Sequence, residues 1–599
     1  MSWRTRGKQA TQQAGAALAH AWQQLLCGLL NARRRLLRRR WADYAVIVLD
    51  HAVAERAPDS PWWYAYLPGV KQPLSLEFLH DALRRMAGDP DLKGVVLLLK
   101  GVELSLAQAQ SLAGLLRRFR AGNGAVRPGA AAKQVVVYLE QANAAAYVVA
   151  CAADRITLPP LATWDVLGLR VAPTYWKETL ARAGIAFEAI QIAPWKTAAD
   201  TLTRRAMSAA EREQYGWLLD SLAEDIVAAV VQGRGLAAAQ VTALIDQAPL
   251  SADAALAAGL VDAIAYEDQL AALLGAAGSP AKLKPYAQIR GLLLRRPRRR
   301  AGRSVGVLSL QGSIVVGDSR SFPVPLPLLG ERMMGSHTVA QAIRAARRRA
   351  DLAAVVVHVD SGGGSALASD LIWRELHLLD QEKPVVVYMG NVAASGGYYI
   401  ATPGRKIVAQ PATLTGSIGV VITKPVTEAL RAKIGANREV LRRGEHADIL
   451  TDDRPWTAEQ RATLEQSVAH IYARFKTVVA QGRNLPLAEL EPICQGRVWT
   501  GKQALRHGLV DELGDFQLAL ALACRAAGLP DDGTVATRRI TLPPTRLLAE
   551  AVQGAQALAR YRGRGTANAW ITALAQGDGS RLLGRERTWL VAPDLPQIE

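Results

Sequence analysis

The chain has 599 residues, half of them hydrophobic, and a formal net charge of +19 at pH 7. This length predicts several domains or repeated units. The positive charge fits nucleic acid, anionic lipid or plain solubility, but no zinc-finger spacing, aromatic-interleaved basic motif or recognition-helix pattern accompanies it, so we expect no nucleic-acid partner. The four cysteines show no CxxC spacing, which argues against a zinc site and a disulfide framework.

The first predicted element is a basic amphipathic segment within residues 1–43. Residues 14–32 are long enough to cross a bilayer, but four polar residues interrupt them, so an interfacial helix is favoured over a membrane span. The sequence "RRRLLRRR" follows directly and suits an anionic membrane surface. Because the arginines come after the apolar part, a cleaved signal peptide is not expected. A soluble helical extension is the alternative to a membrane anchor.

Residues 44–289 and 305–527 are predicted to be two copies of one unit. The string "VVVY" at 135 recurs at 385, a shift of 250, and "GLVD" at 259 recurs at 508, a shift of 249. Upstream, "DLKGVVLLLK" at 91 corresponds to "DLAAVVVHVD" at 351, a shift of 260. Ordered matches of this kind indicate a duplication. Residues 290–304 form a basic linker, and the extension at 528–599 has no counterpart in the first copy.

Both copies predict an α/β fold with a parallel sheet. Apolar runs alternate with helical patterns in each copy, at 45–49, 95–99 and 135–139 and again at 305–310, 355–359 and 385–389. Continuous apolar runs separated by helices are typical of parallel strands covered on both faces. We therefore expect two tandem strand-helix units with right-handed crossovers.

Two segments of the second copy predict a catalytic site. Ser395 in "NVAASGGYYIA" and the glycine turn in "DSGGGS" each follow a predicted parallel strand, and such folds place their sites at the carboxyl ends of strands. A glycine turn lets backbone N–H groups reach an oxyanion, and a serine at a strand-to-helix turn can act as a nucleophile. In the first copy Ala145 stands opposite Ser395, and residues 102–104 replace the three glycines. The glycines could serve only the turns, but their joint loss with the serine favours catalysis.

Three residues are candidates for the base that activates Ser395. His358 lies within a predicted strand, and His446 lies in a polar stretch. Lys196 lies in the apolar sequence "IQIAPWKTAAD", where the ammonium form is disfavoured and the pKa is lowered, as a lysine base requires. The second copy has Glu445 at the position that corresponds to Lys196. One copy has lost the serine and the other the lysine, which indicates one site divided between them.

The motifs "DSGGGSALASD", "NVAASGGYYIA", "TLTGSIGVV" and "APWKTAAD" resemble those of the signal peptide peptidase A (protease IV) family. The resemblance is to its long, internally duplicated form, within the Clp protease and crotonase superfamily. It implies that Ser395 is the nucleophile and Lys196 its general base. It also implies an oxyanion hole at Gly363 and Gly396, and a Ser417 hydroxyl that orients the lysine.

The resemblance further implies a homotetramer at the bacterial inner membrane that degrades hydrophobic peptides, such as cleaved signal peptides, without a metal or other cofactor. The chain departs from the family at Gly362, where a proline is usual, and in its weaker N-terminal apolar segment. Two alternatives stay open. One is a crotonase-like acyl-CoA enzyme, which would carry a carboxylate as acid or base. The other is a non-catalytic, membrane-associated scaffold.

Overall fold

A computed structural model describes residues 22, 24–32, 34, 41–57, 74–122, 132–294, 302–326, 330–542 and 588–591. The chain divides into two units. Unit 1 comprises Met1–Gly168, Glu224–Gly302 and Pro530–Ala536, and unit 2 comprises Leu169–Ala223, Arg303–Leu529 and Thr537–Glu599. The segment Leu169–Ala223 belongs to the first sequence copy but packs within unit 2. The residues of unit 2 therefore come from both sequence copies.

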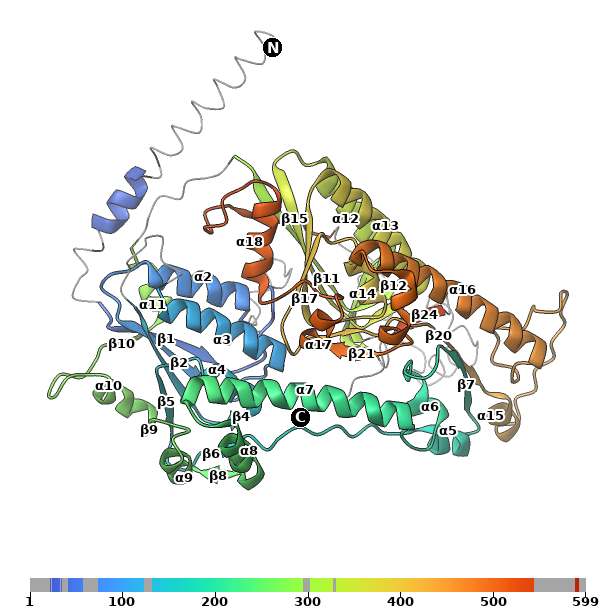
Figure 1. Cartoon of the computed structure of the whole chain (residues 1–599), viewed down its shortest axis with the longest axis horizontal. Helices are drawn as coiled ribbons and strands as arrows, with labels where there is room; N and C mark the ends of the chain where they lie inside the picture. The colour runs from blue at the N-terminus through green and yellow to red at the C-terminus, as the bar shows by residue number, and fades with distance from the viewer. Residues whose placement is uncertain are drawn as a thin grey trace, which may run out of the picture. The chain divides into compact units, whose positions relative to one another are not determined.

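Unit 1 is built on a parallel sheet with the strand order β10-β1-β2-β3-β5-β9. These strands are β1 (Tyr44–Leu49), β2 (Gly94–Leu99), β3 (Gln134–Leu139), β5 (Arg155–Leu158), β9 (Ala263–Ile264) and β10 (Leu283–Pro285). All residues of β2 are buried, as the prediction of a sheet covered on both faces requires. Figure 1 shows α2 (Leu76–Ala87) and α3 (Leu106–Arg120) side by side on one face of this sheet.

The main sheet of unit 2 has the order β21-β19-β17-β15-β11-β23; off this path, β18 pairs with β17, and β22 pairs with β18. Its strands are β11 (Ser304–Gln311), β15 (Leu352–Ser361), β17 (Val385–Ala394), β18 (Lys406–Ala409), β19 (Leu414–Gly416), β21 (Val498–Thr500), β22 (Glu512–Leu513) and β23 (Thr537–Arg539). The central strands pair in parallel, as predicted. In chain order, α12 (Ser336–Arg348) lies between β11 and β15, α13 (Ala366–Glu382) lies between β15 and β17, and α14 (Gly396–Ala401) directly follows β17.

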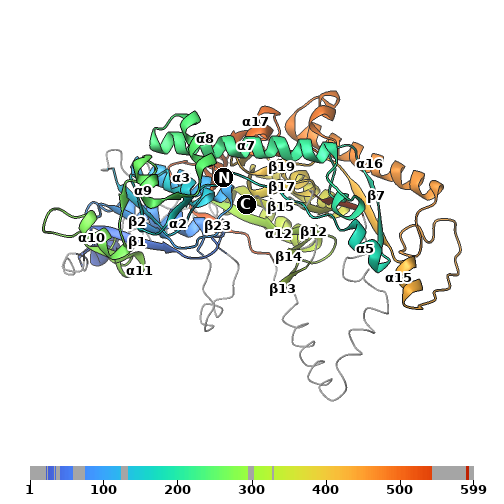
Figure 2. The same ribbon diagram turned by 90° about the horizontal axis from the view of Figure 1, so that it is seen from below.

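A second sheet of unit 2 has the order β13-β14-β12-β16-β24-β20-β7. Its strands are β7 (Ala186–Gln191), β12 (Ser313–Val315), β13 (Arg320–Leu326), β14 (Gly330–Gly335), β16 (Gly363–Ser365), β20 (Val421–Val426) and β24 (Thr588–Val591). Figure 2 shows β12, β14 and β13 at neighbouring positions. Strand β7 comes from the first sequence copy and pairs antiparallel with β20 along its whole length. This ladder anchors the chain directly before Lys196 to the second copy.

Equivalent hydrogen bonds in the two units confirm the duplication. The hydroxyl of Tyr147 donates to the carbonyl of Leu260 at 2.7 Å, and the hydroxyl of Tyr398 donates to the carbonyl of Leu509 at 2.9 Å. The two tyrosines are 251 residues apart (398 minus 147), whereas the preceding "VVVY" strings are 250 apart (385 minus 135). The second copy thus has one extra residue between the strand and the helix.

This extra residue corrects the alignment at Ser395. The short sheet of unit 1, formed by β4 (Ala142–Asn143), β6 (Thr163–Asp165) and β8 (Leu250–Ser251), pairs Ala142 with Trp164. The corresponding ladder of unit 2 pairs Ala393 with Thr415. Ala142 therefore corresponds to Ala393, and Ser395 corresponds to Ala144 rather than to Ala145. The inference that the first copy lacks the serine is unchanged.

The N-terminal segment is described only in part. Residues 24–32 are helical, and the side chains of Trp22, Leu25 and Leu29 are exposed. Among the described residues, no single helix has both the length and the apolar character to span a bilayer; α7 (Ala209–Arg234) and α8 (Ala238–Gln247) meet that criterion only jointly, with a bend of 112° between them. Residues 1–21 of the predicted anchor and most of the extension at 528–599 lie outside the described residues.

Candidate active site

Ser395 occupies the junction between β17, which ends at Ala394, and α14, which begins at Gly396. Its backbone has φ 54° and ψ −116°, a conformation that side-chain-bearing residues rarely adopt and that is found mainly at functional sites. The N–H of Ser395 donates to Gly416 at 2.8 Å, and its carbonyl accepts from Tyr399 at 2.8 Å. The surrounding backbone therefore holds the strained residue on both sides, and its side chain is completely buried.

Lys196 reaches Ser395 from the first sequence copy. Its Nζ lies 2.7 Å from Oγ of Ser395, 3.0 Å from Oγ of Ser417 and 2.9 Å from the carbonyl oxygen of Ser417. The lysine is completely buried, and burial lowers its pKa well below the ordinary value of 10.5. These three predicted site residues are thus brought together, with the lysine in surroundings that favour its neutral form.

Two glycines allow the chain to pack closely against Lys196. A Cβ atom at Gly496, whose φ is 86°, would lie 2.4 Å from the backbone nitrogen of Lys196. A Cβ atom at Gly419 would lie 3.2 Å from Cδ of Lys196. Any larger residue at position 496 would therefore displace the lysine. Sequence reasoning missed Gly496, because its role depends on a contact across 300 residues (496 minus 196).

A stack of one arginine and three tryptophans flanks the lysine segment. The guanidinium carbon of Arg497 lies 3.3 Å from the ring centroid of Trp195, and the rings of Trp217 and Trp499 stack at 5.3 Å. The same guanidinium lies 5.4 and 5.9 Å from the centroids of Trp217 and Trp499. Cation–π contacts of this kind are attractive, more so when partly desolvated. Trp195 precedes Lys196 and Arg497 follows Gly496 in the chain. The stack therefore holds the two segments that meet at the contact between Lys196 and Gly496.

The glycine turn lies directly beside the serine. Gly363 is buried, with a φ of 108° that favours glycine, and a Cβ atom at Gly396 would lie 3.1 Å from Cα of Gly363. The structure therefore places the two predicted oxyanion residues next to each other. In this arrangement the N–H of Gly363 donates to Oγ of Ser361 at 3.2 Å. The hydroxyl of Ser361 in turn donates to the carbonyl of Gly312 at 2.6 Å.

Asp360 is a further residue of the site that sequence reasoning missed. Its Oδ1 accepts from the N–H of Val392 at 3.1 Å, and burial raises the pKa of the carboxyl to about 6. The contact ties the end of β15, just before the glycine turn, to the part of β17 that leads to Ser395. The first copy has Lys100 at this position, by the shift of 260 (360 minus 100). That difference between the copies was a signal that could have identified it.

The two candidate histidines lie in different surroundings. His358 is completely buried in β15, and its ring stacks on Tyr388 with a centroid distance of 5.6 Å. His446 is exposed. The side-chain contact given above for Ser395 is with Lys196.

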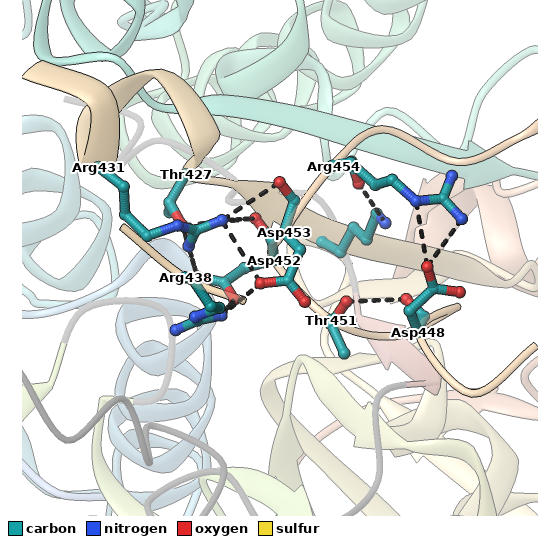
Figure 3. Close-up of polar contacts among 9 residues, drawn as sticks. Thr427, Arg431, Arg438, Asp448, Thr451, Asp452, Asp453 and Arg454 are labelled. Carbon is teal, nitrogen blue, oxygen red and sulfur yellow. Dashed lines mark hydrogen bonds and ion pairs between the residues drawn. The ribbon is translucent and has the colours of Figure 1, made fainter. Parts of the chain in front are cut away.

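Ion pairs hold the segment around His446. Figure 3 shows Arg431 and Arg438 facing Asp452 and Asp453, with the Arg438 pairs at 3.0 and 2.5 Å. Beside them, Arg454 pairs with Asp448 at 2.7 Å. These contacts join the two ends of the segment. They account for the charges around His446, which the sequence already indicated as a solvated loop.

One cluster among the described residues has the donor atoms for a cation. Glu445, His446 and Glu459 place one ligand atom each within 4.8 Å of one another, and all three are exposed. Exposed acidic groups commonly gather in this way without binding a metal. The cluster is not part of the contacts that surround Ser395.

Comparison with known proteins gives a consistent result. The model of "Peptidase family S49" matches residues 129–277 and 377–529, one stretch in each copy. The chain is 31% identical to "Serine protease SPPA, chloroplastic" of Arabidopsis thaliana, over 79% of this chain and 69% of that protein. It is 32% identical to "Protease 4" of Salmonella typhi, over 76% and 72%. Over 28% of its length it is 34% identical to "Putative signal peptide peptidase SppA" of Enterococcus faecium, of which 48% is covered.

Proposed function

Because the chain belongs to peptidase family S49 and is a serine-type peptidase, we propose that Ser395 is its nucleophile and Lys196 its general base. The observation that carries this proposal is the 2.7 Å contact between Nζ and Oγ of two completely buried residues. Membership of a peptidase family leaves no ground for the acyl-CoA enzyme. The dyad would then be split between the sequence copies, although both residues lie within unit 2.

The proposed proton transfer follows from the three contacts of Nζ. A neutral lysine amine has two N–H bonds and one lone pair. With the N–H bonds directed to the carbonyl and hydroxyl oxygens of Ser417, the lone pair faces the hydroxyl of Ser395. Lys196 accepts that proton as Oγ attacks the peptide carbonyl. The resulting ammonium protonates the leaving amine, and water then hydrolyses the acyl-enzyme.

The oxyanion of the tetrahedral intermediate is proposed to lie between Gly363 and Gly396. Backbone N–H groups placed in advance at this position stabilise charge that develops in the transition state. The N–H of Gly396 adjoins the nucleophile. The N–H of Gly363 has to turn away from Oγ of Ser361 before it can contribute. Ser361 thus competes with the oxyanion for this donor.

We further propose hydrophobic peptides, including cleaved signal peptides, as substrates. The support is the resemblance of the motifs and the printed name of the Enterococcus faecium relative. A homotetramer on an anionic membrane surface is proposed from the same resemblance. The net charge of +19 and the exposed apolar side chains of Trp22, Leu25 and Leu29 support the membrane part. Light scattering and sedimentation with anionic vesicles test the two statements separately.

The dyad is tested by hydrolysis of a fluorogenic hydrophobic peptide in the presence of a chelator. We expect Ser395→Ala to reduce kcat at least about 10³-fold and Lys196→Met to reduce it about 10² to 10⁴-fold. Lys177→Met is the matched control, because Lys177 is an exposed lysine of α5 (Lys177–Ala183). It should leave the rate unchanged.

Three outcomes would count against the proposal. Activity retained in Lys196→Met would remove the lysine as base and make His446 the next candidate. A wild-type chain inert on every peptide would favour the non-catalytic scaffold. Equal cleavage of a signal peptide and of an acidic, polar peptide of the same length would contradict the proposed substrate class while leaving the dyad in place.

A further inference from the structure

Lys196 lies on a loop, residues 192–199, whose entrance is fixed by a strand. The loop runs from Gln191, the last residue of β7, to α6 (Asp200–Thr203). Gln191 is also the last residue of the ladder between β7 and β20, where it pairs with Val421. The ladder therefore fixes the chain that enters the loop, and other contacts must fix the chain that leaves it.

A hydrogen bond between the side chains of Gln191 and Asp200 closes the loop. Nε2 of Gln191 donates to Oδ1 of Asp200 at 3.0 Å, and Oδ2 of Asp200 pairs with Nε of Arg204 at 3.1 Å. The backbone N–H of Asp200 donates to the carbonyl of Thr197 at 2.9 Å. Only 2% of Asp200 is exposed. The Gln191–Asp200 clamp thus joins the end of the strand to the start of the helix.

The clamp lies between the loop and a solvent-filled hollow. Both clamp residues line a hollow of about 750 Å³, together with Arg204, whereas Lys196 does not line it and is completely buried. A loop tied at both ends has fewer accessible conformations than one tied at a single end. Without the clamp, the loop can move toward the hollow and admit water to the lysine.

The second sequence copy lacks the clamp as well as the lysine. Glu445 corresponds to Lys196 by a shift of 249 (445 minus 196). By the same shift, Val440 and Ile449 stand in place of the glutamine and the aspartate. Two apolar side chains cannot form this hydrogen bond. The joint difference at all three positions indicates that the clamp and the lysine serve one purpose.

We propose that Asp200 is a positioning residue, which through its hydrogen bond with Gln191 holds the loop so that Nζ of Lys196 stays buried against Ser395. This inference rests on the proposed function for the role of Lys196 as the base. Asp200 acts through the lysine, so its loss should impair proton transfer and leave substrate binding unchanged.

The first test measures peptide hydrolysis. Asp200→Ala should reduce kcat about 10- to 100-fold at unchanged KM, since a displacement of about 1 Å can reduce the rate about 100-fold. Gln191→Met removes the donor and should have the same effect. Asp200→Asn keeps an oxygen that accepts from Gln191 and should restore most of the rate. A wild-type rate in Asp200→Ala, or a loss confined to KM, would overturn the inference.

Asp448 provides a matched control, because it has the same kinds of partner in a different loop of unit 2. It accepts from Nε2 of Gln460 at 2.8 Å and pairs with Arg454 at 2.7 Å, and it is 8% exposed. Asp448→Ala removes a comparable set of contacts and should lower the Tm without lowering kcat. An equal fall of kcat in Asp448→Ala and Asp200→Ala would overturn the positioning role. Circular dichroism verifies that each variant is folded.

The second test titrates the lysine and needs no turnover. The difference in Tm between a chain and its Lys196→Met variant, measured across pH, reports the pKa of Lys196. Burial lowers that pKa from 10.5, so in Asp200→Ala, where water reaches the amine, it should move back toward 10.5. The charged neighbours of Asp200, Arg204 and Glu211, are present in every chain compared.

The direction of the shift distinguishes positioning from a direct effect of charge. Loss of the Asp200 carboxylate charge alone would lower the pKa of Lys196 further, because an anion nearby favours the ammonium form. An unchanged titration in Asp200→Ala, or a shift to lower pH, would therefore overturn the inference.

The two tests separate failure of this inference from failure of the proposed function. A fall of kcat in Lys196→Met without a fall in Asp200→Ala would overturn the inference and leave the dyad in place. A titration that shifts toward 10.5 in chains that hydrolyse nothing would support the positioning of the lysine and contradict the dyad.

Discussion

The same strand-to-helix junction occurs in both units and is built in two different ways. In unit 1, Asn143 precedes α4 (Ala144–Ala150) with φ −67° and ψ 168°, and its side chain accepts from the N–H of Ala146 at 2.9 Å. In unit 2, Ser395 precedes α14 with φ 54°, and its side chain contacts Lys196 instead of the helix. The first junction is a relaxed helix cap. The second junction has no side-chain cap, and its backbone is strained. The side chain of Ser395 is therefore not used to cap the helix.

The comparison shows that the two junctions sit in nearly the same surrounding fold. The flanking ladders are equivalent, since Ala142 pairs with Trp164 in unit 1 as Ala393 pairs with Thr415 in unit 2. One inserted residue and the loss of a capping side chain separate the two. The surroundings of the junction, and not the serine alone, therefore differ between the two copies.

The largest expected effect concerns transfer of the serine to the other junction. A chain with Ser395→Ala and Ala144→Ser carries a serine at the corresponding position of unit 1. We expect it to stay at least about 10³-fold below wild type in peptide hydrolysis, because position 144 is the first residue of a normally capped helix. Hydrolysis restored by Ala144→Ser would show that the two junctions are interchangeable.

The pH dependence of hydrolysis tests whether burial keeps Lys196 neutral at the pH at which the enzyme acts. Since Lys196 must be neutral to accept a proton, kcat/KM should rise about tenfold per pH unit below its pKa and level off above it. Burial lowers that pKa, so the plateau should be reached well before pH 10.5. A rise in kcat/KM that continues to the ordinary lysine pKa would contradict the assignment of the rise to Lys196. The same pH dependence in Lys196→Met would also contradict it.

Thermal unfolding as a function of pH provides an independent measurement on the same residue. Between the lowered pKa of folded Lys196 and the ordinary value of 10.5, the unfolded chain binds a proton that the folded chain does not. Stability contributed by this residue therefore rises with pH across that window and falls as the pH is lowered. The Tm of Lys196→Met should not show this rise with pH. At the acidic end of the window it should exceed the Tm of the wild type.

A smaller effect is expected when the packing around the lysine is disturbed. Gly496→Ala places a Cβ atom 2.4 Å from the nitrogen of Lys196, and a displacement of about 1 Å can reduce the rate about 100-fold. Gly435→Ala is the matched control. Gly435 has φ 68° but open space around its Cα, so this variant bears the backbone strain without moving the lysine. Equal rates for the two variants would contradict the positioning role.

The smallest effect is expected at Ser417. Ser417→Ala removes the hydroxyl contact of 3.0 Å but keeps the carbonyl contact of 2.9 Å with Nζ. One lost hydrogen bond of about 1 kcal/mol corresponds to a rate reduction of about fivefold. The loss should appear in kcat rather than KM. A reduction as large as that of Lys196→Met would mean that Ser417 does more than orient the amine.

The sequence allowed the paired strands and the proximity of Ser395 and Lys196 to be predicted for physical reasons. Strand β2 is buried on both faces. A strand buried in this way consists of consecutive apolar residues, so it can be recognised in the sequence as a continuous apolar run. The reciprocal differences at Ser395 and Lys196 could be seen because the chain provides its own reference copy. Asp360, which differs between the copies in the same way, should have been found by the same comparison.

Other features could not be predicted because they depend on contacts between distant segments. Gly496 and the Arg497–Trp195 stack acquire their roles only when residues near 196 and 497 meet. The pairing of Val591 with Gly363 likewise depends on a strand 228 residues away (591 minus 363). A single sequence carries little information on such pairings, since strand pairing depends on neighbours that are distant in the chain.

The origin of Lys196 within unit 2 has a practical consequence for building a two-component reagent. The segment Leu169–Ala223 lies in the first half of the chain, and the remaining residues of unit 2 lie in the second half. A cut in the linker at residues 290–304 would give two polypeptides, one with the lysine and one with the serine. From the proposed dyad, we expect each polypeptide to be inert alone. Joined by fused interaction partners, the halves would report an encounter between those partners as proteolysis.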